Sequence, residues 1–107
     1  MKAKPYKYDG LKTWMPCEPS EATHVELHAP GPLYHRLIPV ILKGTRARAH
    51  CWSWNGDTEK PTLKPSIRTS DGTTVCHSFV NDGRMQFLYD CTHELAGQTL
   101  DLLEVED

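Results

Sequence analysis

Proline and glycine recur along the whole chain, and this spacing leaves little room for long helices. The 107 residues include eight prolines and seven glycines, and apolar residues show almost no repeat at the helical period. Several short segments instead alternate between apolar and polar residues or are rich in β-branched residues, as strands are. These segments are 23–28, 33–42, 47–54, 60–66, 73–80, 84–90 and 98–105. We therefore expect an all-β or β-dominated α+β fold of about six short strands.

Length and charge limit the architecture and the partners of the chain. A length of 107 residues suits a single domain, residues 1–107, with a modest core. The formal net charge of −2 provides no general basic field for nucleic acid or a membrane surface. Lysines gather in residues 1–12, which we expect to form a flexible basic N-terminus, whereas acidic residues gather from residue 94 onward.

The cellular compartment decides whether the cysteines are expected to form disulfides or to remain free thiols. The start of the chain lacks the apolar region of a signal peptide, and the longest aliphatic stretch, residues 37–42, is too short to span a membrane. We therefore expect a cytoplasmic protein without a membrane partner, located in the host cytoplasm if a phage encodes it. Because thiols stay reduced there, the four cysteines are expected to be ligands or buried thiols.

A group of cysteine and histidine residues flanks a predicted β-hairpin, which turns at residues 81–83. Cys76 and His77 lie near the start of its first strand, and Cys91 and His93 follow the second strand. Zinc prefers four nitrogen or sulfur ligands in a tetrahedron. Since neighbouring strand residues point to opposite faces, only one of Cys76 and His77 joins such a site easily. We predict a structural zinc held by residues of this group, with Cys17 as a further candidate ligand and His24, His50 and Cys51 as alternatives to it.

Catalytic chemistry is also compatible with these residues. A thiol nucleophile, Cys91 or Cys76, could be activated by a histidine and oriented by Asp90. A small zinc hydrolase is a second option, because a zinc ion with an open coordination position activates water. Its ligands and general base would be drawn from Cys91, His93, His77, Glu94 and Asp90.

Basic and aromatic residues in 43–54 suggest a different kind of site. Arg46 and Arg48 precede Trp52 and Trp54, and such a combination binds a nucleotide or single-stranded nucleic acid through charge and stacking. The competing interpretation, which we favour, puts both tryptophans in the core of a β-domain and leaves the arginines in solvent.

Four motifs, taken together, resemble one protein family. They are Trp52-Ser53-Trp54-Asn55-Gly56-Asp57, then Pro61-Thr62 with Pro65-Ser66-Ile67, then Cys76-His77-Ser78-Phe79, and then Asp90-Cys91-Thr92-His93-Glu94-Leu95-Ala96-Gly97. The family is an uncharacterised group of small phage, prophage and bacterial proteins, known as a domain of unknown function, and the resemblance covers residues 50–103. Its members are often labelled ammonia monooxygenase, but this sequence has neither membrane spans nor a copper-type histidine pattern. The resemblance implies a mobile-element origin and a Cys/His metal site, although the upstream CxxC pair of many members is reduced here to Cys17.

These features together favour binding over catalysis, and we assign no catalytic residue. We expect a small zinc-stabilised accessory protein of phage type that binds a host or phage macromolecule, foremost a protein. The alternatives are the small zinc-dependent hydrolase and the binder of a nucleotide or single-stranded nucleic acid.

Overall fold

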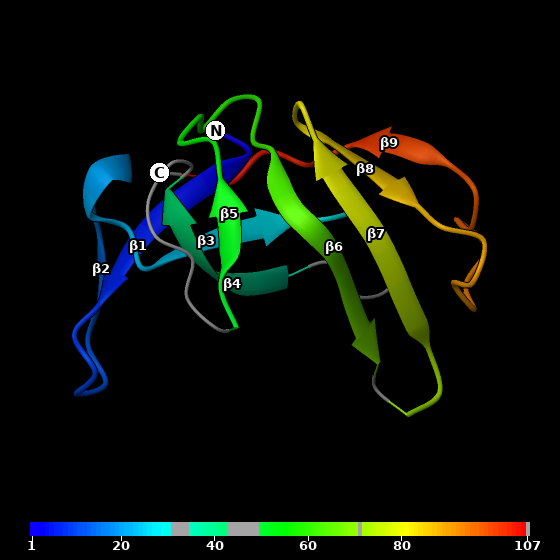
Figure 1. Cartoon of the computed structure of the whole chain (residues 1–107), viewed down its shortest axis with the longest axis horizontal. Helices are drawn as coiled ribbons and strands as arrows, with labels where there is room; N and C mark the ends of the chain where they lie inside the picture. The colour runs from blue at the N-terminus through cyan, green and yellow to red at the C-terminus, as the bar shows by residue number, and fades with distance from the viewer. Residues whose placement is uncertain (31–34, 43–49, 71, 107) are drawn as a thin grey trace.

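The computed structural model describes residues 1–30, 35–42, 50–70 and 72–106, which form nine β-strands (Figure 1). The strands are β1 (Ala3–Tyr8), β2 (Trp14–Pro16), β3 (His24–His28), β4 (His35–Leu42), β5 (Trp52–Trp54), β6 (Leu63–Ser70), β7 (Val75–Asn81), β8 (Arg84–Phe87) and β9 (Thr99–Asp101). One short 3-10 helix, η1, spans Pro19–Glu21, and these four ranges contain no α-helix. No helix in the described ranges is long and apolar enough to cross a membrane.

All nine strands belong to one sheet, in the order β2-β1-β3-β4-β5-β6-β7-β8-β9. Neighbouring strands are antiparallel except β4 and β5, which run parallel. The sheet curves so that side chains from its two halves share one core (Figure 1). A bridge between His28 and Leu103 returns the chain after β9 to β3. The largest fully buried side chains include Trp54, Phe87, Leu27 and Leu63.

The β-dominated fold class predicted from the sequence is confirmed, and the unexpected strands lie at the N-terminal end. Strands β3, β4, β7 and β8 begin within two residues of their predicted segments. Residues 1–12, expected to be flexible, instead contain β1, which pairs with both β2 and β3. Ala3 and Pro5 point into the core, but a small residue and a proline among lysines do not produce a recognisable apolar alternation.

Alternation along β6 and β7 separates a buried face from an outer face. On β7, Cys76 and Ser78 are buried, whereas His77 between them lies on the outer side. On β6, Ile67 is buried and its neighbour Ser66 lies on the outer side. Polar side chains of these two central strands therefore meet on the outer face of the sheet.

The hairpin between β7 and β8 has the tight turn that the sequence predicts. Asn81 pairs with Arg84, so the loop consists of Asp82 and Gly83. Both have a positive φ, 53° and 78°, as a type I′ turn requires at its two central positions. The backbone N–H of Gly83 donates to the Pro61 carbonyl at 2.9 Å, which fastens the hairpin tip to the preceding loop.

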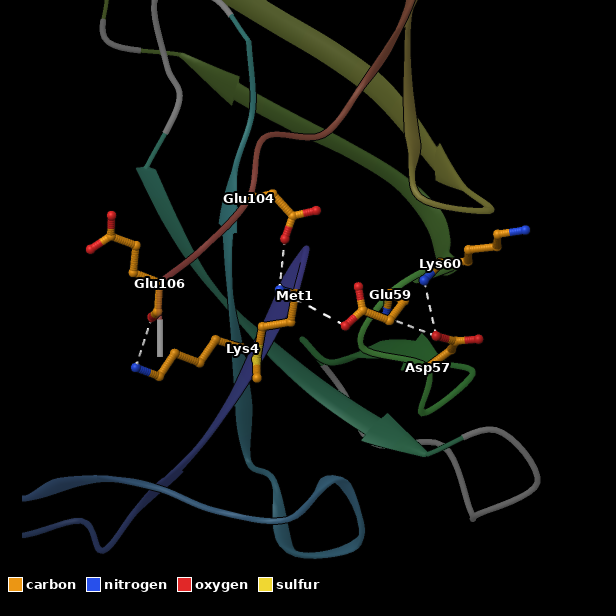
Figure 2. Close-up of polar contacts among 7 residues, drawn as sticks. All are labelled: Met1, Lys4, Asp57, Glu59, Lys60, Glu104 and Glu106. Carbon is orange, nitrogen blue, oxygen red and sulfur yellow. Dashed lines mark hydrogen bonds and ion pairs between the residues drawn. The ribbon is translucent and has the colours of Figure 1, made fainter.

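The first and last described residues lie side by side (Figure 2). The amino group of Met1 is 2.7 Å from a carboxylate oxygen of Glu104 and 3.9 Å from one of Glu59. The ammonium group of Lys4 donates to the backbone carbonyl of Glu106 at 3.1 Å. The hydrogen bond with the amino group holds the pKa of Glu104 below its ordinary value. These contacts hold the segment after β9 against β1.

Replacing Gly83 by Ala should destabilise the fold more than replacing Gly10 by Ala. Both glycines have a positive φ, 78° and 82°, so both variants carry a backbone strain of about 1–2 kcal/mol. A Cβ on Gly83 would also lie 3.2 Å from the Glu59 carbonyl oxygen and from the Lys60 Cα, whereas one on Gly10 meets nothing within 4 Å. Urea denaturation of both variants measures the difference. Equal losses would show that the hairpin tip is not tightly packed.

Candidate active site

Ser66 lies at a bulge in β6. The pairing of β6 with β7 shifts between Leu63 and Ile67, where three residues of β6 face one residue of β7. A bulge bends a strand and changes the direction of its side chains. Ser66 is the last residue of the bulge and is half-buried on the outer face. The indole N–H of Trp52 donates to its carbonyl oxygen at 3.2 Å, which holds the Ser66 backbone from the β5 side.

His77 connects Ser66 to Asp90. Its Nε2 lies 3.0 Å from the Ser66 hydroxyl oxygen. Its Nδ1 lies 2.8 Å and 3.1 Å from the two carboxylate oxygens of Asp90. Because an ionised carboxylate only accepts hydrogen bonds, Nδ1 carries the proton and donates to Asp90. In a neutral ring, Nε2 is then free to accept the hydroxyl proton of Ser66.

The turn that carries Asp90 is bound to β7. The N–H of Leu88 donates to the His77 carbonyl at 2.8 Å, and the N–H of Thr92 donates to the Val75 carbonyl at 3.0 Å. In return, the N–H of Val75 donates to the Thr92 hydroxyl oxygen at 2.7 Å. The turn therefore continues to pair with β7 after β8 has ended, and this pairing brings Asp90 beside His77.

The surroundings of Asp90 favour its charged form. Its hydrogen bond with His77 holds the pKa of the carboxyl group below the ordinary value, and the positive charge of Arg68 acts in the same direction. The side chain of Asp90 is 57% exposed and that of His77 is 23% exposed. Together with the half-buried Ser66, these groups lie where a substrate could reach them.

Such a chain of serine, histidine and aspartate is suited to acyl transfer. The histidine takes the hydroxyl proton as the serine attacks a carbonyl carbon, and the aspartate orients the ring and stabilises its cationic form. The distances in this protein agree with the hydrogen-bond reach of about 2.6–3.2 Å that a nucleophile and its base require. Ser66, His77 and Asp90 therefore form a candidate catalytic triad.

Three of the predicted metal ligands, Cys76, Cys91 and His93, come together in a second cluster. Their ligand atoms lie within 4.8 Å of one another, so the group could hold a metal ion. Burial, reinforced by the nearby Cys91, raises the pKa of the Cys76 thiol to about 11. The Nε2 of His93 is buried and has no hydrogen-bond partner among the described residues. Its Nδ1 accepts from the Leu95 N–H at 3.2 Å.

The two remaining predicted ligands lie elsewhere. Both ring nitrogens of His77 are occupied by Ser66 and Asp90, so His77 belongs to the candidate triad. Cys17 follows β2, at the opposite edge of the sheet from β8 and β9, and is half-buried. It is not among the three residues whose ligand atoms come together.

The predicted nucleic-acid site is described only in part. Trp54 is fully buried and Trp52 packs partly against the core, which supports the core interpretation of the two tryptophans. Arg46 and Arg48 lie outside the described residues.

Ser66 is the site residue that sequence reasoning missed. The sequence analysis assigns His77 as a candidate zinc ligand, and Asp90 as a residue that orients the histidine beside a cysteine nucleophile or as the base of a zinc hydrolase. The available signal was a polar residue after a proline in an extended segment, one strand away from a histidine. That signal is weak, because the bulge that brings Ser66 to His77 depends on strand register, which the sequence does not reveal.

Residues 13–88, more than half of the chain, match a family described as bacterial ubiquitination-like system serine protease (BubE). The chain belongs to this family. No curated protein and no solved structure is significantly similar to it. The BubE match agrees with the expected bacterial small-protein family, but its description does not mention phages. Ser66 and His77 lie within the region matched to BubE, and Asp90 lies just beyond it.

Replacing His77 by Ala should raise the pKa of Asp90 toward its ordinary value of 3.8. The charged form of Asp90 contributes to stability above the unfolded-state pKa, and this contribution is lost as the pH falls through the lower folded-state pKa. Carbon-13 NMR titration of the Asp90 carboxyl group measures the shift. His24→Ala, on β3, serves as a control that should leave this pKa unchanged. An Asp90 pKa that is the same with and without His77 would contradict the hydrogen bond.

Proposed function

We propose that this protein is a serine protease of a bacterial ubiquitination-like system, with Ser66 as nucleophile. The observation that carries the proposal is the continuous hydrogen-bonded chain from the Ser66 hydroxyl through His77 to Asp90. The BubE family, described as a serine protease, has the same class of nucleophile. We infer that its partners are proteins of that system and that it acts in the bacterial cytoplasm, where its cysteines stay reduced.

The first half of the reaction forms an acyl-enzyme. The Ser66 oxygen attacks the carbonyl carbon of a peptide bond while Nε2 of His77 takes the hydroxyl proton. His77 then gives that proton to the leaving amine, the C–N bond breaks, and the acyl group remains as an ester on Ser66. Throughout this half, Asp90 accepts a hydrogen bond from the Nδ1–H of His77 and stabilises the imidazolium that forms transiently.

The second half returns the enzyme to its starting state. Water attacks the Ser66 ester while His77 takes one of its protons, and the same proton then returns to the Ser66 oxygen. The sum is hydrolysis of one peptide bond by one water molecule. Asp90 remains a carboxylate in both halves, in keeping with its lowered pKa.

A hollow that extends along β6 as far as Pro65, the residue before Ser66, offers space for the substrate chain. It is about 560 Å³ in volume and is lined by Lys64, Pro65 and Phe79, among others. Phe79 lies two residues after His77 on the outer face of β7, and its side chain is 43% exposed. An apolar side chain next to the scissile bond would pack there, while the bond itself reaches Ser66.

Labelling with a fluorophosphonate, which reacts with activated serines, tests the proposal. The wild-type protein should be labelled at Ser66, and Ser66→Ala should abolish the labelling. His77→Ala and Asp90→Asn should slow it by roughly 10³-fold or more, as the loss of a triad member does. Ser70→Ala, on the same strand, is the matched control and should react like the wild type.

A cleavage assay extends this test to the natural chemistry. Proteins of a bacterial ubiquitination-like system are incubated with the wild-type or the Ser66→Ala protein, and mass spectrometry detects new chain termini. Cleavage by the wild type alone supports the proposal. Unchanged labelling of Ser66→Ala, or equal cleavage by both proteins, would refute it.

A structural zinc at Cys76, Cys91 and His93 is a second proposal, which follows from the sequence and from the proximity of the three ligand atoms. Two sulfurs and one imidazole suit zinc. Loading would have consequences, however. Zinc binding through Nε2 of His93 needs the ring proton on Nδ1, where the Leu95 N–H now donates. Zinc binding would also remove the proton of the Cys91 thiol, which now donates to the His77 carbonyl.

Metal analysis of the purified protein tests this zinc proposal. If the zinc is structural, the wild-type protein contains about one equivalent of the metal, and Cys76→Ala and His93→Ala lose it. Chelation of the zinc should unfold the wild-type protein. Cys17→Ala serves as a comparison, since Cys17 lies apart from the cluster and should not alter the zinc content. Less than a tenth of an equivalent in the wild type would refute the zinc proposal.

A further inference from the structure

We propose that Cys91 is a positioning residue, whose thiol binds the backbone of His77 and so keeps Asp90 against the imidazole. This inference rests on the proposed function, because it concerns the geometry of the candidate triad. Cys91 touches neither the Ser66 hydroxyl nor the scissile bond in the mechanism above. It acts through His77, whose backbone it binds, and through Asp90, which precedes it in the chain.

Two hydrogen bonds of the Cys91 thiol go to the backbone of His77. The N–H of His77 donates to the Cys91 sulfur at 3.1 Å, and the Cys91 thiol donates to the His77 carbonyl at 3.1 Å. The residue is only 8% exposed, so water competes little for these contacts.

The thiol replaces a strand partner that β8 cannot provide. The last pair between β7 and β8 joins Ser78 to Phe87, so a regular ladder would next pair His77 with Leu88. Leu88 still donates to the His77 carbonyl, but its own carbonyl accepts from the Cys91 N–H at 3.2 Å as the chain turns. The N–H of His77 would then lack its strand partner, and the Cys91 sulfur accepts it instead.

This arrangement couples the thiol to the catalytic geometry. Asp90 immediately precedes Cys91, so its Cα lies about 3.8 Å from the Cα of Cys91. Fixing the sulfur against the His77 backbone therefore fixes the start of the Asp90 side chain relative to the imidazole. The Asp90 side chain is 57% exposed, and water can therefore compete for its hydrogen bond with His77. The hydrogen bonds of the buried Cys91 thiol hold the turn against β7 without this competition.

The test compares Cys91→Ala with Ser78→Ala, a matched control that shortens another buried polar side chain next to His77. Fluorophosphonate labelling gives a maximal rate and a half-saturating concentration for each folded variant. We expect Cys91→Ala to lower the maximal rate by about 10–100-fold, because a misplacement of about 1 Å costs that much, with the half-saturating concentration within about two-fold of the wild type. Ser78→Ala should stay near the wild-type rate.

A conservative replacement and a spectroscopic signal separate positioning from a general loss of stability. Cys91→Ser can still accept and donate, and should recover most of the lost rate. The proton NMR signal of the His77 Nδ1–H should persist in Cys91→Ser and shift or broaden in Cys91→Ala. If Cys91→Ala does not fold, Cys91→Val fills the space without a polar group and takes its place.

Three results would overturn the inference while leaving the proposed function intact. They are a Cys91→Ala protein with wild-type rate and signal, a Ser78→Ala protein that slows as much as Cys91→Ala, and a wild-type protein with one equivalent of zinc that is lost in Cys91→Ala. A wild-type protein that is not labelled at Ser66 would instead overturn the proposed function, and this inference with it.

Discussion

The register between β6 and β7 is the constraint on which the candidate site depends. His77 lies opposite Arg68, and this pairing puts the imidazole on the outer face while Cys76 and Ser78 enter the core. A slip of one residue would exchange the two faces, burying the imidazole and exposing the thiol. The bulge before Ile67 then determines where Ser66 lies. Ser66 and His77 thus meet because the bulge in β6 directly precedes the regular pairing of β6 with β7.

A second set of contacts determines where the residues after β8 lie relative to β7. The turn that follows β8 remains hydrogen-bonded to β7 through Leu88 and Thr92, and the carboxylate of Asp90 reaches His77 as a result. The cysteine and histidine residues that suggest a metal site in the sequence surround this turn. The buried Cys91 thiol can serve the His77 backbone or a metal ion, and the two uses require different protonation states.

Local patterns predicted much of the fold and only part of the site. The hairpin at Asp82 and Gly83 was predictable, because its turn chemistry and the flanking alternation agree. The sequence predicts that Cys91 and His93 lie close to one of Cys76 and His77, and the structure brings Cys76 to them. His77, predicted as a metal ligand, instead contacts Ser66 and Asp90. Strand β1 was not predicted, since its inward residues include Ala3 and Pro5, which do not resemble an apolar face.

The identity of the nucleophile could not be predicted for a different reason. Cysteine and histidine attract attention in any sequence because few residue types bind metals or attack carbonyls, whereas serine is common on surfaces. Ser66 becomes distinctive only once its hydroxyl lies 3.0 Å from an imidazole nitrogen. That distance follows from the pairing of two strands and the length of a bulge, and neither is a property of the residues near Ser66 alone.

The short spacing of the candidate triad along the chain has a consequence for folding. Ser66 and His77 are 11 residues apart, and His77 and Asp90 are 13 apart. All three therefore lie on the β6-β7-β8 meander and its following turn, where closing the connecting loops costs little chain entropy. The contact between Met1 and Glu104 spans 103 positions and carries a larger entropic cost. In kinetic terms the reactive centre is local, and it can assemble before the two ends of the chain have met.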